Sequence, residues 1–509
     1  MGKRLLLWAL TALLSLKVLG QAAPSGAVPD LKSLETTLSD LLPVVKQPFL
    51  KKYMENLKSE TLALGKNSVL VPDNLGLLRK EIANAGKLVA DMKDLPQGSP
   101  WQKTPFICYV VPAISAVRRV PDSLPPDGKL EHQIEIVAAQ GEFEPASFVI
   151  APFADTAKFE LKASELQGSK GKIPAGCVDI KLVKCWWQAG TAWNSYFADP
   201  TRRELVPELL LNDESLIKVD MERKEHYLRV DYPDGPEYVW ISYQYPETPK
   251  IEREHRFDYF REPVADSPAL LPVKLESGQA KQFWVTVKVP EKTPGGIYEG
   301  SISLSADGVP SGEIAVKLRV LPFCLPDPRT YYDLDHDFYS TMYLLGSLPE
   351  HLKANGNNSE LAEKRLRALY KNQKAHNIYN YFGPDLDSKA LSGFPEDKER
   401  QALIIRNLEL VKDAGFKAPL FAPFSASGSI GLQGETGTEK LAQYMKGAEE
   451  YLKITRRILG HQDVYAWGAG EPGRKTILAQ MPGWEALHGI GVKISSEAQP
   501  RHFPIAGYA

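Results

Sequence analysis

The chain has 509 residues, of which 43% are hydrophobic and 24% are charged, and its formal net charge is −2. This composition excludes a disordered chain, and the length allows several domains. The near balance of 61 basic and 63 acidic residues also excludes the basic surface by which proteins bind nucleic acid or anionic membranes, so no nucleic-acid partner is expected.

The first residues have the layout of a secretory signal peptide. Lys3 and Arg4 precede an apolar run from Leu5 to Leu16, and small residues follow up to Ala23. A membrane anchor is the alternative, but the run is shorter than the ~20 residues that a spanning helix needs. Residues 1–23 are therefore predicted to be a signal peptide. The protein is expected to be secreted, periplasmic or at the cell surface, with no membrane span after cleavage.

Residues 30–100 follow a helical pattern. Leucines recur at spacings of three and four from Leu31 to Leu42, and the pattern resumes from Leu75 to Met92 after a break around Pro72. This predicts a helical hairpin. A packing or spacing role is expected for it, because it carries no group of residues suited to chemistry.

Residues 103–325 change to short β-rich runs separated by Gly and Pro clusters, as in an antiparallel β-sandwich. The run from Phe283 to Val289 alternates apolar and polar side chains, which places them on opposite faces of a strand. Trp186 and Trp187 form an aromatic pair that can stack on a sugar ring, and packing of the sandwich is the alternative.

The four cysteines are an even number, which is compatible with disulfides in an exported protein. They are Cys108, Cys177, Cys185 and Cys324. Buried free thiols are the alternative. Their spacing fits no zinc motif, and no metal and no cofactor are predicted.

Residues 330–509 alternate predicted β-strands with amphipathic helices, the pattern of a parallel sheet. The predicted strands are Tyr331–Tyr339, Ala375–Phe382, Ala418–Phe424, Asp463–Gly470 and Gly491–Ser496, with a further strand starting at Phe503. The predicted helices are Glu360–Asn372, Lys398–Ala414, Thr438–Leu459 and Thr476–His488.

A (β/α)8 TIM-type barrel needs about 250 residues, and the region from 330 to 509 is shorter. We therefore expect the barrel to be incomplete in this chain, either truncated at its C-terminus or completed by a partner. A doubly wound sheet is the alternative. It normally carries a Gly-rich phosphate loop after its first strand, and Leu334 to Ser340 contain no glycine.

The segment from Asp463 to Pro472 ends a predicted strand in Gly-Glu-Pro. Barrels hold their catalytic acids at the carboxyl ends of strands, so Glu471 is predicted to be catalytic, as a general acid/base. Trp467 nearby offers a flat apolar face to a sugar ring. A solvated loop glutamate is the alternative, because short motifs have weak specificity.

Sugar-compatible groups also follow the other predicted strands, and their convergence on one face predicts a substrate-binding site. These candidates are Asp335, His336, Tyr381, Asp385 and Phe424, with Glu497 as a second carboxylate. A surface or packing role is the alternative for each of them.

Several segments, taken in their order along the chain, resemble glycoside hydrolase family 123, also met as domain of unknown function 4091. They are Gln140–Pro145, Trp187–Gly190, Leu210–Asp213, Gln282–Trp284, Pro294–Gly300 and Val320–Phe323. The resemblance covers about residues 105 to 500. It implies a β-sandwich joined to a (β/α)8 barrel. It also implies retaining hydrolysis of β-linked N-acetylgalactosaminides, in which the substrate's acetamido oxygen attacks the anomeric carbon.

The resemblance further implies an adjacent Asp-Glu pair at the end of the fourth barrel strand. Glu471 matches the acid/base, but Gly470 stands where the family has the aspartate that orients the acetamido group. Losing such a positioned charge typically costs on the order of 10²-fold in rate. A different glycoside or mechanism in the same fold stays open.

Three hypotheses follow from these residues. The first is an exported glycoside hydrolase-like protein that acts on β-linked glycosides, with N-acetylhexosaminides among the candidates. The second is a non-catalytic carbohydrate-binding or cell-surface protein of the same architecture. The third places glycan binding in the β-sandwich, at Trp186 or Trp187.

Overall fold

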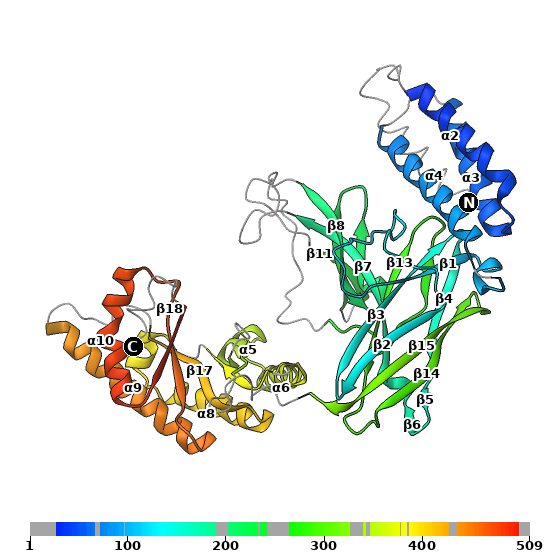
Figure 1. The fold of residues 1–509 in the computed structure, drawn as a ribbon. Helices are drawn as coiled ribbons and strands as arrows, with labels where there is room; N and C mark the ends of the chain where they lie inside the picture. Colours follow the sequence, from blue (N-terminus) through cyan, green and yellow to red (C-terminus); the bar gives the residue numbers. More distant parts are fainter. Residues whose placement is uncertain are drawn as a thin grey trace. The chain divides into compact units, whose positions relative to one another are not determined.

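The computed structural model describes residues 27–66, 72–95, 97–189, 202–232, 235–241, 264–325, 339–342, 347–376, 378–383, 386–426 and 435–497. The chain divides into two compact units. The first comprises Met1–Phe257 with Val264–Leu325, and the second comprises Asp258–Pro263 with Pro326–Ala509. In Figure 1 the elements of the first unit run from blue to green and those of the second from yellow to red. The predicted signal peptide, residues 1–23, lies outside the described residues, within which no helix is long and apolar enough to cross a membrane.

Within the described part of the first unit, three long helices precede the strands: α2 (Ala27–Leu41), α3 (Pro48–Lys66) and α4 (Pro72–Lys93). The sequence predicted a two-helix hairpin, so the break before α3 is a correction. Its cause is proline, which lacks an amide N–H and is tolerated only in the first turn of a helix. Pro43 lies in the 3-10 turn η1 (Leu42–Val44), and Pro48 begins α3.

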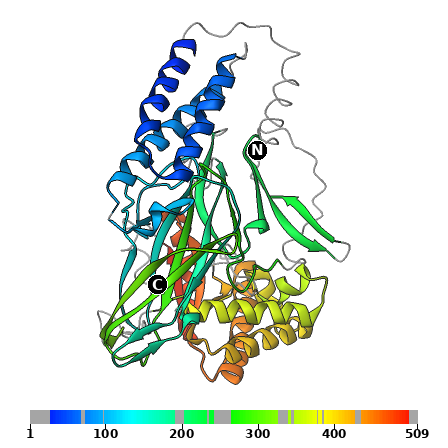
Figure 2. The same ribbon diagram turned by 90° about the vertical axis from the view of Figure 1, so that its right-hand side faces the viewer.

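The helices share one hydrophobic core with the β-sandwich that follows, and Figure 2 shows them beside its strands. Leu38, Leu50 and Met54 are fully buried in the same cluster as Phe106. Polar contacts also join the parts, among them the following two. Tyr109 donates a hydrogen bond to Asp91 at 2.6 Å, and the Gln47 side chain donates one to the Thr104 carbonyl at 2.6 Å. The helical region is therefore part of the folded unit rather than a separate spacer.

One sheet of the sandwich has the strand order β1-β3-β13-β7-β8 among the described residues. Its strands are β1 (Phe106–Val111), β3 (Phe143–Pro152), β13 (Lys281–Lys288), β7 (Val178–Ala189) and β8 (Arg203–Leu211). All of its neighbouring strands pair antiparallel, as the sequence predicted.

The second sheet has the order β12-β4-β14-β15-β2, with β5 and β6 paired off this path. Its strands are β12 (Val273–Leu275), β4 (Thr156–Ala163), β14 (Gly296–Ala306), β15 (Val309–Cys324), β2 (Gln133–Gln140), β5 (Leu166–Gly168) and β6 (Gly171–Ile173). The predicted sandwich was antiparallel throughout, but β15 pairs with β2 in parallel. The 3-10 turn η2 (Pro100–Gln102) lies between α4 and β1, and η3 (Ala175–Cys177) lies between β6 and β7.

The sandwich core is aromatic where the two sheets face each other. Phe148 and Phe283, on neighbouring strands of the first sheet, stack with ring centroids 5.3 Å apart. Phe159 of the second sheet lies 6.0 Å from Phe283 and 5.3 Å from Phe106. Alternation along each strand brings these rings to the inner faces, and their burial supplies much of the apolar contact between the sheets.

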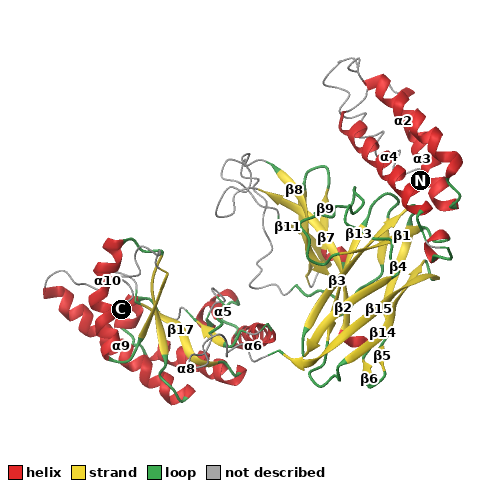
Figure 3. Cartoon of the chain, in the orientation of Figure 1, coloured by secondary structure: helices red, strands yellow, loops and turns green. Residues whose placement is uncertain are grey.

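A small third sheet, β11-β10-β9, belongs to the same unit, and Figure 3 shows its position beside β7 and β8. Its strands are β9 (Ile217–Asp220), β10 (Glu225–Tyr232) and β11 (Gly235–Trp240), and the 3-10 turn η4 (Glu214–Leu216) leads into it. Leu211, Leu216 and Ile217 form a separate small core beneath it.

His226 on β10 gives this small sheet a pH-dependent stability. Its side chain is 5% exposed, and burial, together with the nearby Arg203 charge, lowers its pKa to about 4, while Glu225 opposes the shift. The unfolded chain binds a proton near the ordinary pKa of ~6.5, whereas the folded chain stays neutral until about 4. Folding stability is therefore expected to fall as the pH drops from 6.5 toward 4.

Urea unfolding of wild type and His226→Phe across that pH window checks this expectation. The variant keeps a ring against Trp186, whose centroid lies 4.5 Å from that of His226, but it cannot titrate. Its free energy of unfolding should change less between neutral and acidic pH than that of the wild type. The exposed His488→Gln variant serves as the control. An equal pH response in wild type and His226→Phe contradicts the assignment.

The second unit contains a parallel sheet with the strand order β16-β17-β18-β19 among the described residues. Its strands are β16 (Asn380–Phe382), β17 (Lys417–Ser425), β18 (Val464–Gly470) and β19 (Lys493–Glu497). Strands that follow one another in the chain are also neighbours in the sheet, as in part of a (β/α) barrel, whereas a doubly wound sheet reverses its order. The first and last predicted strands, Tyr331–Tyr339 and the one starting at Phe503, lie outside the described residues except for Tyr339.

Helices alternate with these strands: α5 (Leu348–Ala354), α6 (Ser359–Ala375), α7 (Ser388–Ser392), α8 (Lys398–Ala414), α9 (Glu435–Leu459) and α10 (Arg474–Gly489). The four helices predicted from amphipathic patterns correspond to α6, α8, α9 and α10. Several of these helix starts are capped by side chains, among them those of α6 and α8. Asn358 accepts a hydrogen bond from the Leu361 amide, and Asp397 accepts one from the Arg400 amide. The fold thus comprises a β-sandwich and a partial barrel-type sheet.

Candidate functional site at the strand ends of the second unit

The carboxyl ends of β18 and β19 bring two glutamates to one edge of the parallel sheet. Gly470, the last residue of β18, pairs in register with Glu497, the last residue of β19. Glu471 follows Gly470 directly and is exposed. Parallel strands lie about 4.8 Å apart, so the two glutamates belong to the same part of the sheet edge.

Glu471 has an unusual backbone conformation, with φ of 45°. This left-handed region costs a residue with a Cβ roughly 1–2 kcal/mol. Before it, Gly468 is packed closely against β19, since a Cβ there would lie 3.0 Å from the Ser496 side chain, and Pro472 after it is buried. Residues held in such conformations cluster at functional sites, because the surrounding structure has to hold them there.

Because of this strain, Glu471→Gly is expected to stabilise the protein by about 0.5–1 kcal/mol. This gain in the free energy of unfolding is the strain of ~1–2 kcal/mol that is released, minus the ~0.5–1 kcal/mol that the flexibility of glycine costs. Urea unfolding of the purified protein measures it. The matched control is Glu485→Gly, since Glu485 is exposed on α10 and glycine there should cost about 1 kcal/mol. A loss of stability in both variants contradicts strain at Glu471.

Four half-buried aromatic side chains line one face of the sheet, from near the amino end of β18 toward its carboxyl end, and we call them the aromatic face. They are Phe382, Phe421, Tyr465 and Trp467. The Trp467 ring meets Phe382 edge-to-face at 5.5 Å, and Phe421 stacks on Tyr465 at 4.9 Å with an interplanar angle of 18°. Tyr465 and Trp467 share the face because side chains alternate along β18. Of the four, Trp467 is the nearest to Glu471 along β18, and a flat apolar ring near a carboxylate suits the binding of a sugar ring.

The amino end of the same strands holds a structural ion pair instead. Lys493 contacts Asp463 at 2.8 Å, and its ammonium lies 5.0 Å from the centre of the Tyr465 ring. The hydrogen bond to Asp463 raises the pKa of Lys493 above its usual value, despite partial burial. In barrels, charges at this end serve stability and those at the carboxyl end serve function.

Two of the residues predicted from sequence as sugar contacts lie on the opposite, helix-facing side. Tyr381 is 2% exposed, its hydroxyl accepts a hydrogen bond from Asn407 on α8 at 2.9 Å, and its ring meets Tyr370 on α6. Phe424 is fully buried, with its ring 5.5 Å from that of Tyr451 on α9. Both side chains pack the core, and such burial leaves no surface for a sugar, so their placement corrects the expectation.

The neighbours of these residues occupy the aromatic face instead. Phe382 follows Tyr381, and Phe421 precedes Phe424, with an irregular pairing between β17 and β18 from Phe421 to Ser425. Sequence reasoning selected the position at each strand end and missed these two. Alternation along a strand divides its side chains between two faces. Which face packs against the helices depends on the register of the strand in the folded unit, and the sequence pattern does not give that register.

The remaining candidates are placed only in part. Asp335, His336 and Asp385 lie outside the described residues. Glu497 is described as the last residue of β19. The structure therefore brings Glu471, Trp467 and the backbone of Glu497 together at one edge.

Trp186 and Trp187 of the sandwich are half-buried and have partners. Trp186 Nε1 donates to Glu208 at 2.6 Å, and its ring lies beside His226. Trp187 Nε1 donates to the Asp220 carbonyl at 3.1 Å. These contacts join β7 to β8 and to the small third sheet. They correspond to the packing role that was the alternative to sugar stacking for these two tryptophans.

The four cysteines are free thiols. Cys108 is buried, Cys177 and Cys185 are partly buried, and Cys324 is exposed. Burial raises the pKa of Cys185 to about 12 and that of Cys108 further, which disfavours the thiolate form that a cysteine nucleophile requires.

Comparison with known proteins gives structural likenesses only. No protein-family model matches the chain, and no curated protein matches it. A family 123 glycoside hydrolase from Clostridium perfringens, described for glycolipid glycan hydrolysis, is 11% identical with a TM-score of 0.49 over 78% of this chain. The chain spans 64% of the length of that structure.

Two further structures are more distant. A GH5 xyloglucanase from Bacteroides ovatus, in complex with a XXXG heptasaccharide, is 9% identical, with a TM-score of 0.18, over 72% of this chain and 63% of its own. The β-glucuronidase 2 of Bacteroides uniformis is 11% identical, with a TM-score of 0.17, over 69% of this chain and 30% of its own. At these scores the comparisons do not assign the chain to a family.

Proposed function

We propose that this protein is an exported glycoside hydrolase-like enzyme that acts on β-linked glycosides, with Glu471 as its general acid/base. One observation carries the proposal. An exposed glutamate in a left-handed conformation directly follows a parallel strand that carries Trp467, and the neighbouring strand also ends in glutamate. The sequence resemblance to a glycosidase family points the same way.

The chemistry requires two carboxyl groups on opposite sides of the glycosidic bond. One protonates the leaving oxygen, and the other attacks the anomeric carbon or activates water. Glu471 is proposed as the proton donor and Glu497 as its counterpart. Trp467 would stack on the sugar ring. Retaining enzymes hold the two carboxyl groups roughly 5–5.5 Å apart and inverting enzymes roughly 6.5–9.5 Å apart.

The residue before Glu471 is Gly470, and it argues against hydrolysis that is assisted by the substrate's acetamido group. Attack by the substrate's own acetamido group needs a carboxylate that stabilises the developing positive charge, and position 470 is glycine. A mechanism that uses Glu497 needs no acetamido group. N-Acetylhexosaminides therefore stay among the candidate substrates but are not required ones.

The test is hydrolysis of a panel of aryl β-glycosides, N-acetylgalactosaminide included, by the full chain. Turnover that falls in both Glu471→Gln and Glu497→Gln supports the pair. Proton NMR of the first sugar product then shows whether its anomeric configuration is retained or inverted. Absence of turnover across the panel by folded protein rejects the proposal in favour of a non-catalytic carbohydrate-binding protein.

A further inference from the structure

The first unit contains a hollow of about 610 Å³ beside the turn η4, which we call the η4 hollow. Its walls come from β7, η4, β9, β11 and the segment before β12. Its volume is that of a small-molecule site. The side chains that bear on its chemistry are Lys184, Glu214, Ser215, Lys218, Tyr238 and Leu271.

One carboxylate in the η4 hollow is shared by two lysines. Glu214 contacts both Lys281 and Lys184, the latter at 3.2 Å, and the three side chains are only 16–23% exposed. Burial alone would raise the pKa of Glu214, but the two ammonium groups hold it below its usual range. Burial lowers the pKa of Lys281, and Glu214 offsets this only in part. The group therefore carries one more positive than negative charge.

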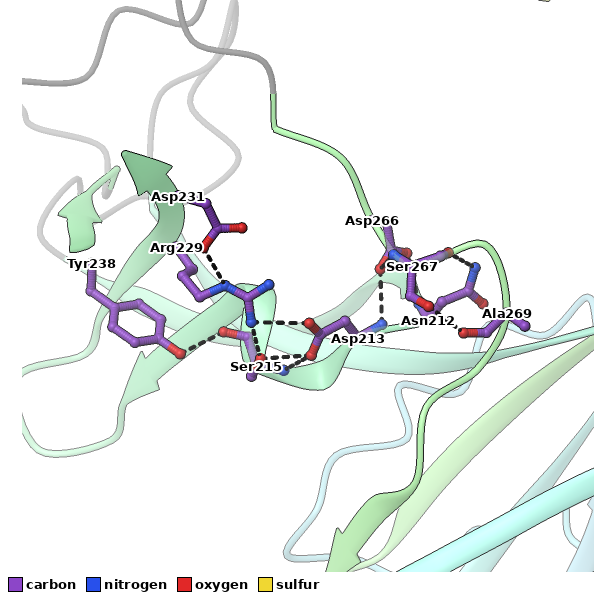
Figure 4. A network of polar contacts seen from close by, with 9 residues as sticks. All are labelled: Asn212, Asp213, Ser215, Arg229, Asp231, Tyr238, Asp266, Ser267 and Ala269. Atoms are coloured by element: carbon purple, nitrogen blue, oxygen red, sulfur yellow. Dashed lines mark hydrogen bonds and ion pairs between the residues drawn. The ribbon is translucent and has the colours of Figure 1, made fainter. Parts of the chain in front are cut away.

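The other carboxylate in the wall is that of Asp213, and Figure 4 shows that it already contacts Arg229 and Ser215. Arg229 contacts Asp213 at 3.0 Å and Asp231 at 3.3 Å. The Asp213 side chain also accepts a hydrogen bond from the Ser215 amide at 2.9 Å, and the Tyr238 hydroxyl donates to the Ser215 carbonyl at 2.6 Å. This network fixes the shape of the wall, and Arg229 compensates mainly Asp213, because the other carboxylate that it contacts, Asp231, is 70% exposed and hydrated.

A third ammonium group, that of Lys218, adds positive charge to the η4 hollow. Lys218 is exposed on β9, and its Nζ lies 5.7 Å from the Tyr227 ring centre and 5.8 Å from that of Tyr238. Among the residues that the structure describes, no carboxylate forms an ion pair with Lys218. Tyr238 is 41% exposed and Leu271 43% exposed, which provides an aromatic and an apolar surface beside the two lysines.

We propose that the η4 hollow binds a ring-bearing carboxylate, namely a uronic acid residue of a glycan. Lys184 and Lys218 supply the charge for the carboxylate, and Tyr238 with Leu271 supplies the surface for the ring. A neutral sugar would leave the ammonium charge uncompensated, and a small inorganic anion would leave the apolar surface uncovered. The η4 hollow uses none of the residues proposed for hydrolysis, so its test is independent of that proposal.

Isothermal titration of the full chain with digalacturonic acid, the matched neutral digalactose and inorganic phosphate tests this. Digalacturonic acid is expected to bind best, and less tightly at high ionic strength. Lys184→Gln and Lys218→Gln should each weaken that binding by about tenfold, the effect of one lost charge-assisted contact. The exposed Lys162→Gln on β4 is the control and should bind like wild type.

Three outcomes overturn the proposal. They are equal binding of the neutral disaccharide or of phosphate, wild-type affinity in both lysine variants, and no binding of digalacturonic acid. Lys218 is exposed and forms no ion pair with a described residue, so Lys218→Gln still tests the role of the lysines if Lys184→Gln fails to fold.

Discussion

Replacing Glu471 by glutamine is expected to lower kcat by about 10²–10⁴-fold on an aryl β-glycoside that the wild type hydrolyses. Glutamine has nearly the same shape, so the exposed strand end should keep its conformation. It cannot donate a proton to the leaving oxygen. Initial rates of aryl alcohol release at saturating substrate measure the effect, and KM should change much less than kcat, since the lost interaction forms only in the transition state.

The leaving group distinguishes a proton donor from a residue with a structural role. A dinitrophenolate leaves without protonation, so Glu471→Gln should slow dinitrophenyl glycosides far less than glycosides of weakly acidic phenols. A glutamate that only shapes the site should affect both classes alike. Glu485→Gln, on the exposed side of α10, is the matched control and should keep wild-type rates. Equal loss on both substrate classes contradicts the role of Glu471 as general acid.

Replacing Gly447 by alanine is expected to destabilise the second unit by about 3 kcal/mol, at the upper end of the usual cost of overpacking. Gly447 is buried in α9 where that helix crosses α7. A Cβ there would lie 1.8 Å from the carbonyl oxygen of Leu391, which is backbone and cannot rotate away. Alanine favours a helix over glycine by about 1 kcal/mol, so the clash must exceed this gain. Urea unfolding, followed by fluorescence and circular dichroism, measures the difference.

The control for this prediction is Gly489→Ala at the end of α10. Nothing lies within 4 Å of the position where its Cβ would be built, so stability should stay the same or rise by up to about 0.5 kcal/mol. If Gly447→Ala is as stable as Gly489→Ala, then α7 and α9 do not approach as closely as the structure shows.

The sequence by itself determined the local structure of the second unit. Apolar periodicity predicted α8 with the bounds that the structure has, Lys398–Ala414, because a helix buries one stripe and ends at Gly415 in the left-handed conformation. The strand before Glu471 could be predicted because an apolar run ending in Gly-Glu-Pro is a local pattern. Proline also determined the start of α3, although the pattern of leucines concealed it.

Only the tertiary structure decided which side chains share a face. Tyr381 and Phe382 are adjacent aromatic residues with the same local propensity, and contact with Asn407 and Tyr370 turns the first toward the helices. Phe424 also faces the helices, and it lies where the pairing of β17 with β18 is irregular. The η4 hollow depends on Glu214 meeting Lys281, which lies 67 positions further along the chain. Such contacts arise from packing between strands, and periodicity within a segment carries no information about its partner in space.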